Sequence, residues 1–478
     1  MLNHFDLIVI GCGPGGYKSA IMAAQLNYKV ALIEKASPGG TCLNEGCVPK
    51  EALTRIAKLL DDATAFKGHG LNGNITADFE DAIKHKDHLV RSISDSVKPW
   101  LVRLGVHFIR GHASFVNKKS ILVESEKESR TLLGDRIIIA TGSKPKQHPT
   151  LDSTTANVIY SQTFMQKQTS LPKRVLCVGG GCIGTELGYV LKQFGAEVTI
   201  VENGDRLLNN YDNIPDRASS ALLKKCKSLG INVKLNTRAI TEISTESSIN
   251  VLFSDNSAEG FDLVLIAIGR EANTDNLKLE NAGVTTDENG FIKTNPFLET
   301  QTEGIYAVGD VKQGAMTANE AFHDAKIATN NALSGNNLKS NQTQVPIVID
   351  SALQIASVGL TEDAADAAGF ETEVARTNLA SSTKAQLTHD VNGFIEVVHD
   401  EASGKVLGGC VVGPQAREMI HTITAACQSD RGLWFFTDLN YAHPSWNEEL
   451  ENTIYRYANA FTPNPTVTDK SNHPITSE

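Results

Sequence analysis

The chain has 478 residues, of which 41% are hydrophobic, and its formal net charge is −11. This length exceeds one ordinary hydrophobic core and predicts two to four domains of a soluble α/β protein. The negative charge, with no basic run to offset it, argues against nucleic acid as the main partner, and no apolar stretch is long enough to span a membrane. The N-terminus leads directly into a strand without a leader, so we expect a cytoplasmic protein.

The first predicted unit is a strand, turn, helix and strand of the kind that binds dinucleotides. An apolar strand at residues 6–10 runs directly into Gly11-x-Gly13-x-x-Gly16, and residues 30–33 form the second strand. Gly11 permits a tight turn, Gly13 lets the backbone approach a pyrophosphate, and Gly16 allows the helix to pack closely on the strand. Glu34 ends the second strand, where a carboxylate can accept hydrogen bonds from a ribose. The alternative is a glycine turn with a purely structural role.

Two cysteines follow this unit closely, within residues 39–49. Cys42 and Cys47 are five residues apart at the start of a predicted helix, so they can close a disulfide beside the ligand of the upstream glycines. If that ligand is a flavin, the disulfide can accept electrons from it. The chain has eight cysteines, too few for a secreted disulfide scaffold, and we expect most of the others to be buried thiols.

The same arrangement recurs later in the chain. A strand at residues 174–178 leads into Gly179-x-Gly181-x-x-Gly184, and a strand at residues 198–202 ends in Glu202. Two complete motifs predict two dinucleotides, although a duplicated copy without a ligand is the alternative. Glu202 would repel a 2′-phosphate and bind a free 2′-hydroxyl, which favours NAD over NADP. Arg206 lies close enough in sequence to weaken that preference.

Taken together, these segments resemble the flavin-dependent pyridine nucleotide–disulfide oxidoreductases, and within them the dihydrolipoamide dehydrogenase branch. The resemblance covers residues from about 5 to 460. The motifs that carry it, besides the two glycine fingerprints, are Gly40-Thr41-Cys42-Leu43-Asn44 with Gly46-Cys47-Val48-Pro49, Ala140-Thr141-Gly142-Ser143, Ala267-Ile268-Gly269-Arg270, the segment from Tyr306 to Asp310, and His443-Pro444-Ser445-x-x-Glu448.

The resemblance implies the cofactors FAD and NAD, no metal, and a redox-active Cys42–Cys47 disulfide. It implies that Cys42 exchanges with the substrate dithiol and that Cys47 lies against the flavin. His443, supplied by the partner subunit, would act as the base, with Glu448 holding its ring. The implied FAD contacts are Gly11, Gly13, Gly16, Glu34, Thr41, Thr141, Gly142 and Asp310, and the implied NAD contacts are Gly179, Gly181, Gly184, Glu202 and Gly269.

The implied activity is the oxidation of dihydrolipoyl groups by NAD+. The enzyme would be a homodimer that serves the carrier domains of 2-oxo-acid dehydrogenase complexes. Two alternatives stay open: a nicotinamide-dependent reductase of another small-molecule or protein disulfide, and a flavin-bound redox sensor with low turnover. Glu202 disfavours a glutathione reductase-like activity, and the absence of any cysteine after Cys427 disfavours a mercuric reductase-like one.

One departure from the branch pattern lies beside the redox cysteines. The branch usually has Pro-Ser-Lys after the second cysteine, and that lysine pairs with a glutamate near the flavin. Here the segment is Pro49-Lys50-Glu51, and the matching Glu186 is retained. Because two close carboxylates repel each other, we expect Lys50 to supply the cation for Glu186 while Glu51 turns outward. The alternative is a solvated Lys50 and a slow or retuned enzyme.

Two smaller departures, at residues 318–321 and 350–354, lie where partner or substrate selection could differ. The predicted fold is α/β, with two Rossmann-like dinucleotide-binding domains and a C-terminal α+β interface domain for dimerisation. The expected boundaries are residues 1–145 and 272–344 for the FAD-binding domain, 146–271 for the NAD-binding domain, 345–461 for the interface domain, and 462–478 for a disordered tail.

Overall fold

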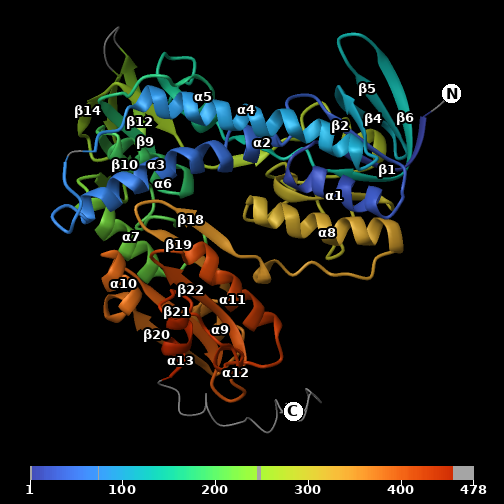
Figure 1. The fold of residues 1–478 in the computed structure, drawn as a ribbon. Helices are drawn as coiled ribbons and strands as arrows, with labels where there is room; N and C mark the ends of the chain where they lie inside the picture. Colours follow the sequence, from blue (N-terminus) through green and yellow to red (C-terminus); the bar gives the residue numbers. More distant parts are fainter. Residues whose placement is uncertain (1–2, 74, 245–248, 456–478) are drawn as a thin grey trace.

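The structure, a computed structural model, describes residues 3–73, 75–244 and 249–455. Two α/β regions fill the upper part of Figure 1, and an antiparallel sheet with its helices lies below them. The predicted tail at residues 462–478, and the last part of the predicted interface domain at 456–461, lie outside the described residues. Within the described part, no helix combines the length and the apolar character needed to cross a bilayer.

The first sheet has seven strands in the order β3-β2-β1-β6-β5-β4, and β17 pairs with the end of β6. Its strands are β1 Asn3–Ile10, β2 Val30–Glu34, β3 His107–Arg110, β4 His112–Asn117, β5 Ser120–Glu124, β6 Ser129–Ile139 and β17 Ile305–Ala307. The β1, β2, β3 and β17 strands run parallel to β6, whereas β4 and β5 form an antiparallel extension. The chain thus returns to this sheet at β17 after passing through the second region.

The alternation of side chains along β1 explains why both faces of this sheet are covered. Leu7 and Val9 pack in the cluster that contains Ala20 of α1 and Ala328 of α8, whereas Ile8 and Ile10 pack in the cluster on the opposite face. Helices α1 and α8 lie side by side below the sheet in Figure 1. The helices of this region are α1 Pro14–Gln25, α2 Gly40–Asn44, α3 Cys47–Ala65, α4 Phe79–Arg103 and α8 Ala318–Ser334.

The second region contains a five-stranded parallel sheet in the order β11-β10-β9-β15-β8. These strands are β8 Val158–Tyr160, β9 Arg174–Val178, β10 Glu197–Val201, β11 Asn232–Lys234 and β15 Leu263–Ile266, and the helices are α5 Ser161–Lys167, α6 Cys182–Gln193 and α7 Asp216–Ser228. A separate antiparallel sheet consists of β12 Ala239–Ser244, β13 Ile249–Phe253 and β14 Ala258–Phe261. Two connecting strands, β7 Ser143–Pro145 and β16 Arg270–Ala272, pair antiparallel and join the two regions.

The C-terminal region is an antiparallel sheet in the order β18-β19-β22-β21-β20. Its strands are β18 Ile347–Asp350, β19 Gln354–Gly359, β20 Thr372–Asn378, β21 Phe394–Asp400 and β22 Val406–Val412. Its helices are α9 Glu362–Ala367, α10 Thr383–Thr388, α11 Ala416–Gln428, α12 Trp434–Thr437 and α13 Glu448–Ile454. Short 3-10 helices occur at η1 Leu279–Ala282, η2 Gly309–Val311, η3 Gln342–Gln344 and η4 Leu379–Ser381.

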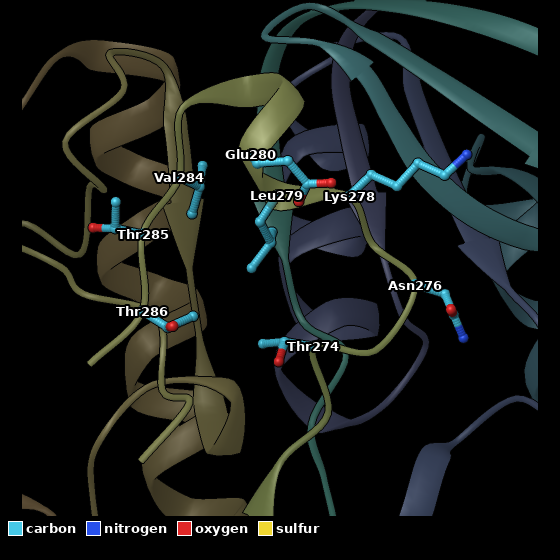
Figure 2. Close-up of a pocket in the computed structure, with 8 residues that line it drawn as sticks. All are labelled: Thr274, Asn276, Lys278, Leu279, Glu280, Val284, Thr285 and Thr286. Atoms are coloured by element: carbon cyan, nitrogen blue, oxygen red, sulfur yellow. The ribbon is translucent and has the colours of Figure 1, made fainter. Parts of the chain in front are cut away.

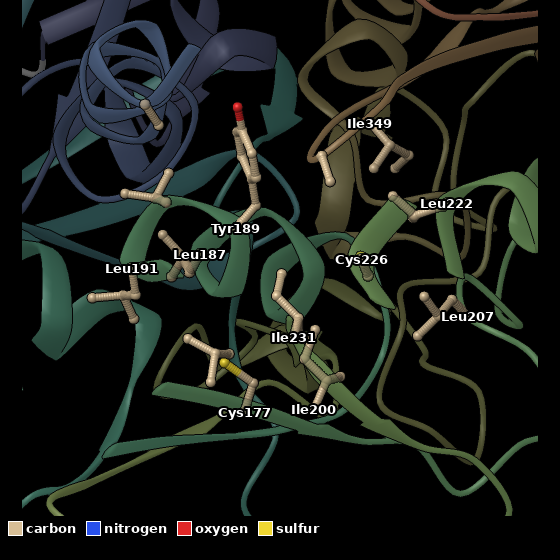
Figure 3. Close-up of a cluster of buried hydrophobic side chains, with 14 of the residues drawn as sticks. Cys177, Leu187, Tyr189, Leu191, Ile200, Leu207, Leu222, Cys226, Ile231 and Ile349 are labelled. Atoms are coloured by element: carbon tan, nitrogen blue, oxygen red, sulfur yellow. The ribbon is translucent and has the colours of Figure 1, made fainter. Parts of the chain in front are cut away.

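A continuous apolar cluster joins the second region to its neighbours (Figure 3). It contains Cys177 of β9, Tyr189 of α6 and Ile349 of β18. The Tyr189 hydroxyl points out of this cluster toward α3 and donates to Asp61 Oδ2 at 3.4 Å. Because Leu53 and Ala57 of α3 are buried in the same cluster, α3 is held against both the second region and the C-terminal sheet.

Candidate active site

The first glycine turn forms an open cradle at the start of α1. A Cβ on Gly11 would lie 2.3 Å from the Ala140 carbonyl oxygen, and one on Gly16 would lie 1.9 Å from the Gly11 oxygen, so neither position admits a side chain. A Cβ on Gly13 would meet nothing within 4 Å, although Gly13 is the residue that caps the helix. The space beside Gly13 and the unpaired N–H groups of the first helical turn fit a pyrophosphate.

Glu34 lies at the end of β2 and braces this cradle. Its two carboxylate oxygens accept from the backbone N–H groups of Cys12 and Ala36, each at 2.7 Å. Each oxygen keeps a lone pair that can accept from a ribose hydroxyl. The cysteine segment lies directly against the cradle, because a Cβ on Gly40 would be 2.7 Å from the Gly13 Cα. Thr41 is the next residue, in α2.

The connecting strands bring a second set of predicted residues toward the first sheet. Among the residues that the structure describes, Thr141 Oγ1 is buried without a hydrogen-bond partner, and a Cβ on Gly142 would meet nothing within 4 Å. Asp310 accepts from Ser143 Oγ at 2.6 Å, and the same Oγ accepts from Arg270 Nε at 2.7 Å. Burial raises the pKa of Asp310, and Ser143 and Arg270 partly offset that rise. The orphaned hydroxyl, the open glycine and the oriented carboxylate fit an FAD ribityl chain and its surroundings.

The second glycine turn has nearly the same close backbone contacts as the first. A Cβ on Gly179 would lie 2.3 Å from the Ala267 oxygen, and one on Gly184 would lie 2.0 Å from the Gly179 oxygen. Gly181 caps α6, where a Cβ would meet only Asn210 Oδ1 at 3.4 Å. A Cβ on Gly269, which is also predicted to contact NAD, would meet nothing within 4 Å. This second cradle fits the pyrophosphate of a nicotinamide nucleotide.

Glu202 directly follows β10 and repeats the role of Glu34. Its oxygens accept from the N–H groups of Gly180 and Gly204, each at 2.7 Å. Arg206 points elsewhere: its Nη1 donates to Ile214 O and Ser219 Oγ, both at 3.1 Å, and its Nε lies 3.2 Å from Asp216 Oδ1. The Arg206 guanidinium, whose charge weakened the predicted preference for NAD over NADP, is therefore already bound to three groups on the protein.

Cys42 lies in α2 and Cys47 is the first residue of α3, and both are thiols in the structure. A hydrogen bond from Cys42 lowers the pKa of Cys47, and burial opposes this effect while the Lys50 charge reinforces it. The same hydrogen bond, together with burial, raises the pKa of Cys42. The N-terminus of a long helix also favours a thiolate at the first position. The pair therefore holds its negative charge on Cys47.

Lys50 lies one turn after Cys47 and makes the contact expected from the sequence. Its Nζ is 3.2 Å from Glu186 Oε1, and its side chain is 13% exposed, so the alternative of a solvated Lys50 is wrong. Burial lowers the pKa of Lys50, but the carboxylates of Glu186, Asp350 and Glu51 outweigh it, and the net direction is upward. Glu51 is half-exposed and turns toward Arg417 at 3.0 Å, while it stays 3.6 Å from Lys50.

His443 and Glu448 form a pair at the other end of the molecule. His443 Nδ1 lies 2.9 Å from Glu448 Oε2, and the Ser445 N–H donates to Glu448 Oε1 at 3.3 Å. The imidazole is 72% exposed and lines a pocket of about 580 Å³ with residues of β20 and α13. In Figure 1, α13, which begins at Glu448, lies near the bottom of the molecule, whereas α2, which contains Cys42, lies in the upper part.

The structure also brings together residues that sequence reasoning did not assign to the site. Asp350 was noted only as part of a departure from the branch pattern, yet it is 1% exposed and contacts Lys58 and Arg417. Glu320, from the other departure, pairs with the buried Lys312 at 2.8 Å. Ser143 and Arg270 belong to two of the motifs that indicated the family, so the sequence did point to their bridge to Asp310. Arg417 belongs to no motif, and no pattern in the sequence pointed to it.

The remaining cysteines divide into two groups. Cys12, Cys177, Cys226 and Cys410 are buried, as expected, whereas Cys182 and Cys427 are partly exposed. A pocket of about 660 Å³ lies away from all of these cysteines, between the loop at residues 274–280 and the segment at 284–286 (Figure 2). Figure 2 shows polar side chains such as Lys278 and Thr285 pointing in different directions around it. They do not converge on one point, and this pocket carries no part of the site.

Comparison with known families identifies the fold and its chemistry. The family model described as pyridine nucleotide-disulphide oxidoreductase matches residues 5–325, and the dimerisation domain of the same family matches residues 345–454. The chain belongs to the pyridine nucleotide–disulphide oxidoreductases. This oxidoreductase is therefore a flavoprotein that uses FAD and NAD(H), and its C-terminal domain makes it a homodimer.

Curated relatives match this oxidoreductase along nearly its whole length. It is 36% identical over 463 residues to a dihydrolipoyl dehydrogenase of Thermus scotoductus, covering 94% of this chain and 96% of that protein. It is 33% identical over 454 residues to a dihydrolipoyl dehydrogenase of Bacillus subtilis, covering 93% and 94%. These relatives bear out the resemblance that the motifs indicated.

Solved structures add a second kind of neighbour. The HOCl-induced flavoprotein disulfide reductase RclA from Escherichia coli has a TM-score of 0.82 at 26% identity, covering 94% of this chain and 98% of that one. LpdA from Mycobacterium tuberculosis has a TM-score of 0.88 at 22% identity, covering 95% and 99%, which shows the shared fold. Both solved structures thus share the fold of this chain.

Proposed function

We propose that this flavoprotein disulfide oxidoreductase is a dihydrolipoyl dehydrogenase, which oxidises dihydrolipoyl groups to the lipoyl disulfide with NAD+ as acceptor. The observation that carries the proposal is the pairing of two half-sites. Cys42 and Cys47 lie beside the first cradle, and an exposed His443–Glu448 pair lies in the dimerisation domain. The curated relatives with the same full-length organisation are named dihydrolipoyl dehydrogenases.

In the proposed reaction the resting enzyme holds a Cys42–Cys47 disulfide. One thiolate of the substrate attacks Cys42 Sγ, the bond to Cys47 breaks, and Cys47 leaves as a thiolate. The second substrate thiolate then attacks the substrate sulfur bound to Cys42, which releases the lipoyl disulfide and leaves two reduced cysteines. The substrate loses two electrons and the two cysteines gain two.

His443 is proposed to accept the substrate's thiol protons across the dimer interface. Its Nδ1 contacts Glu448, which fixes the ring and leaves Nε2 for a thiol of the neighbouring subunit's substrate. Cys47, with its lowered pKa, is the better leaving thiolate of the pair. FAD bound in the first cradle would supply the chemistry that transfers two electrons from the reduced cysteines to NAD+ bound in the second cradle.

NAD rather than NADP is the proposed acceptor, because Glu202 occupies the position of a 2′-phosphate contact and Arg206 is engaged elsewhere. The physiological donors would be lipoyl carrier domains of 2-oxo-acid dehydrogenase complexes in the cytoplasm. These partners are inferred from the names of the relatives.

A second candidate is the reduction of another disulfide by a nicotinamide nucleotide. Two observations favour it: the 26% identity to RclA, described as a disulfide reductase, and Glu51 in place of the usual lysine beside the flavin. Glu51 is also the reason to consider a low-turnover redox sensor as a third candidate.

One anaerobic experiment separates these candidates. The FAD-loaded protein is mixed with dihydrolipoamide or NADH, and its absorption spectrum is recorded. Its oxidation of dihydrolipoamide with NAD+ and NADP+ and its NADH-dependent reduction of glutathione disulfide are then measured. We expect a long-wavelength thiolate–flavin band, rapid oxidation of dihydrolipoamide, and a clear preference for NAD+. The band with turnover on glutathione disulfide but not on dihydrolipoamide would move the assignment to the second candidate. Intact FAD without the band would favour the sensor.

A further inference from the structure

Six charged side chains from four elements form a network behind the redox cysteines. They are Lys50, Glu51 and Lys58 of α3, Glu186 of α6, Asp350 of β18 and Arg417 of α11. Three are cations and three are carboxylates, so the network is neutral as a whole. It joins the helix that begins at Cys47 to both the second region and the C-terminal domain.

Lys50 stands between two competing carboxylates. Its Nζ is 3.2 Å from Glu186 Oε1 and 3.6 Å from Glu51 Oε2. Glu186 is the more enclosed of the two, with an exposed side-chain fraction of 11% against 42% for Glu51. Glu186 also accepts from the Asp350 N–H at 2.8 Å, which fixes its orientation.

Arg417 provides Glu51 with a different partner. Its Nη2 lies 3.0 Å from Glu51 Oε2 and 2.9 Å from Asp350 Oδ2, so one guanidinium nitrogen joins both carboxylates. Lys58 binds the other oxygen of Asp350. Asp350 is buried and holds Arg417 in place, so that Glu51 Oε2 lies closer to Arg417 Nη2, at 3.0 Å, than to Lys50 Nζ, at 3.6 Å.

We propose that Arg417 is a positioning residue that binds Glu51 more closely than Lys50 does, and so keeps the Lys50 ammonium on Glu186, beside Cys47. This inference rests on the proposed function of Cys47 as the thiol next to the flavin. It also connects two departures from the branch pattern, because Glu51 and Asp350 both end on Arg417. Glu51 stands where the branch usually has a lysine, and Arg417 of the C-terminal domain neutralises the Glu51 charge.

The consequence for Cys47 follows from its charged surroundings. The groups that act on it are Cys42 of α2, Lys50 of α3, Glu186 of α6, Tyr17 of α1 and Arg270 of β16. Lys50 is among those that favour the thiolate, and Glu186 opposes it. If Arg417 were lost, Glu51 would compete for Lys50, and the thiolate would lose part of its cation.

The test measures the pH dependence of the thiolate–flavin band in the reduced holoenzyme, with wild type, Arg417→Met and the double variant Arg417→Met/Glu51→Gln. We expect the pH at which half of the band is lost to rise by about 1 unit in Arg417→Met. The double variant should return close to the wild-type value, because the competing carboxylate is gone. The pH dependence of Cys47 alkylation, followed by mass spectrometry, should shift in parallel.

A matched control is Arg431→Met, which removes the Arg431–Asp438 pair of the same C-terminal domain and should leave the pH dependence unchanged. If Arg417→Met does not fold, Arg417→Lys keeps a cation for Asp350 and should show a smaller shift in the same direction. An unshifted band, or a shift that Glu51→Gln does not relieve, would overturn the inference. Absence of the band in the wild type would instead overturn the proposed function.

Discussion

At the scale of single residues, the proposed chemistry depends on the difference in pKa between two neighbouring thiols. Cys47 begins α3 and has a lowered pKa, whereas Cys42, five residues earlier, has a raised one. Lys50 contributes to that difference and is itself held by Glu186. A pair with one low and one high pKa has a defined leaving group and a defined attacking position, as thiol exchange requires.

The residue-scale prediction is that Lys50→Ala raises the pKa of Cys47. Lys50 lowers that pKa in the folded protein, so its removal means that Cys47 becomes protonated at a higher pH as the solution is acidified. We expect the thiolate–flavin band to be lost about 1 pH unit earlier on acidification, with slower turnover at neutral pH. Lys84→Ala, on the exposed face of α4, is the control. Unchanged spectra and turnover in Lys50→Ala would show that Lys50 has no part in the site.

At the scale of elements, the two glycine turns are built by the same rule. In each, the first and third glycines are excluded from substitution by a backbone oxygen at 1.9–2.3 Å, and the middle glycine faces open or nearly open space. The first and third glycines therefore serve the fold, and the middle one serves the ligand. A carboxylate at the end of the second strand (Glu34) or directly after it (Glu202) then stabilises each turn by accepting hydrogen bonds from two backbone N–H groups.

This division predicts two different failures in the first turn. Gly16→Ala should destabilise the protein by about 3 kcal/mol, because its Cβ cannot avoid the Gly11 oxygen. Gly13→Ala should fold normally but bind FAD about tenfold more weakly, since the methyl group enters the space of the pyrophosphate. Gly181→Ala should keep its flavin and weaken only NAD+ binding. The measurements are the thermal midpoint and the FAD-to-protein ratio; full FAD content in Gly13→Ala would contradict the assignment.

At the scale of the whole molecule, a single chain carries two incomplete halves of the proposed site. The cysteines lie with the first cradle, and His443 belongs to the dimerisation domain, residues 345–454. A two-fold dimer can bring the His443 of each subunit to the cysteines of the other and so build two complete sites. The His443 side chain is 72% exposed in the single chain, as a group that serves a neighbouring subunit requires.

The dimer makes a prediction about mixtures of inactive variants. Cys42→Ser and His443→Gln should each lose nearly all dihydrolipoamide oxidation as homodimers. When the two are unfolded and refolded together, about half of the dimers are mixed, and each mixed dimer has one intact site, so about a quarter of the wild-type activity should return. Turnover before and after mixing is the measurement. No recovery, despite mixed dimers seen by native mass spectrometry, would place both groups in one subunit.

Much of this protein follows from sequence because its signals are local. The glycine spacings, the cysteine pair at a helix start and the carboxylate after a strand each occupy a few consecutive residues, and local geometry alone relates them. Lys50 and Glu186 were connected only through the resemblance, and the burial that makes their pair effective is a tertiary property. The opposed pKa shifts of the two cysteines likewise depend on surrounding charges from several elements.

The sequence by itself determined the family and the positions of the two glycine turns, and it predicted the redox pair, since each is encoded in short motifs with steric requirements. Only the tertiary structure decided where Glu51 points, because its partner Arg417 is far along the chain on α11 and stands in no motif. It also decided that Asp350 belongs to the same network and that Arg206 is unavailable to a phosphate. Charges act over a few ångströms of space rather than over distance in sequence, so their balance is set only when the domains pack.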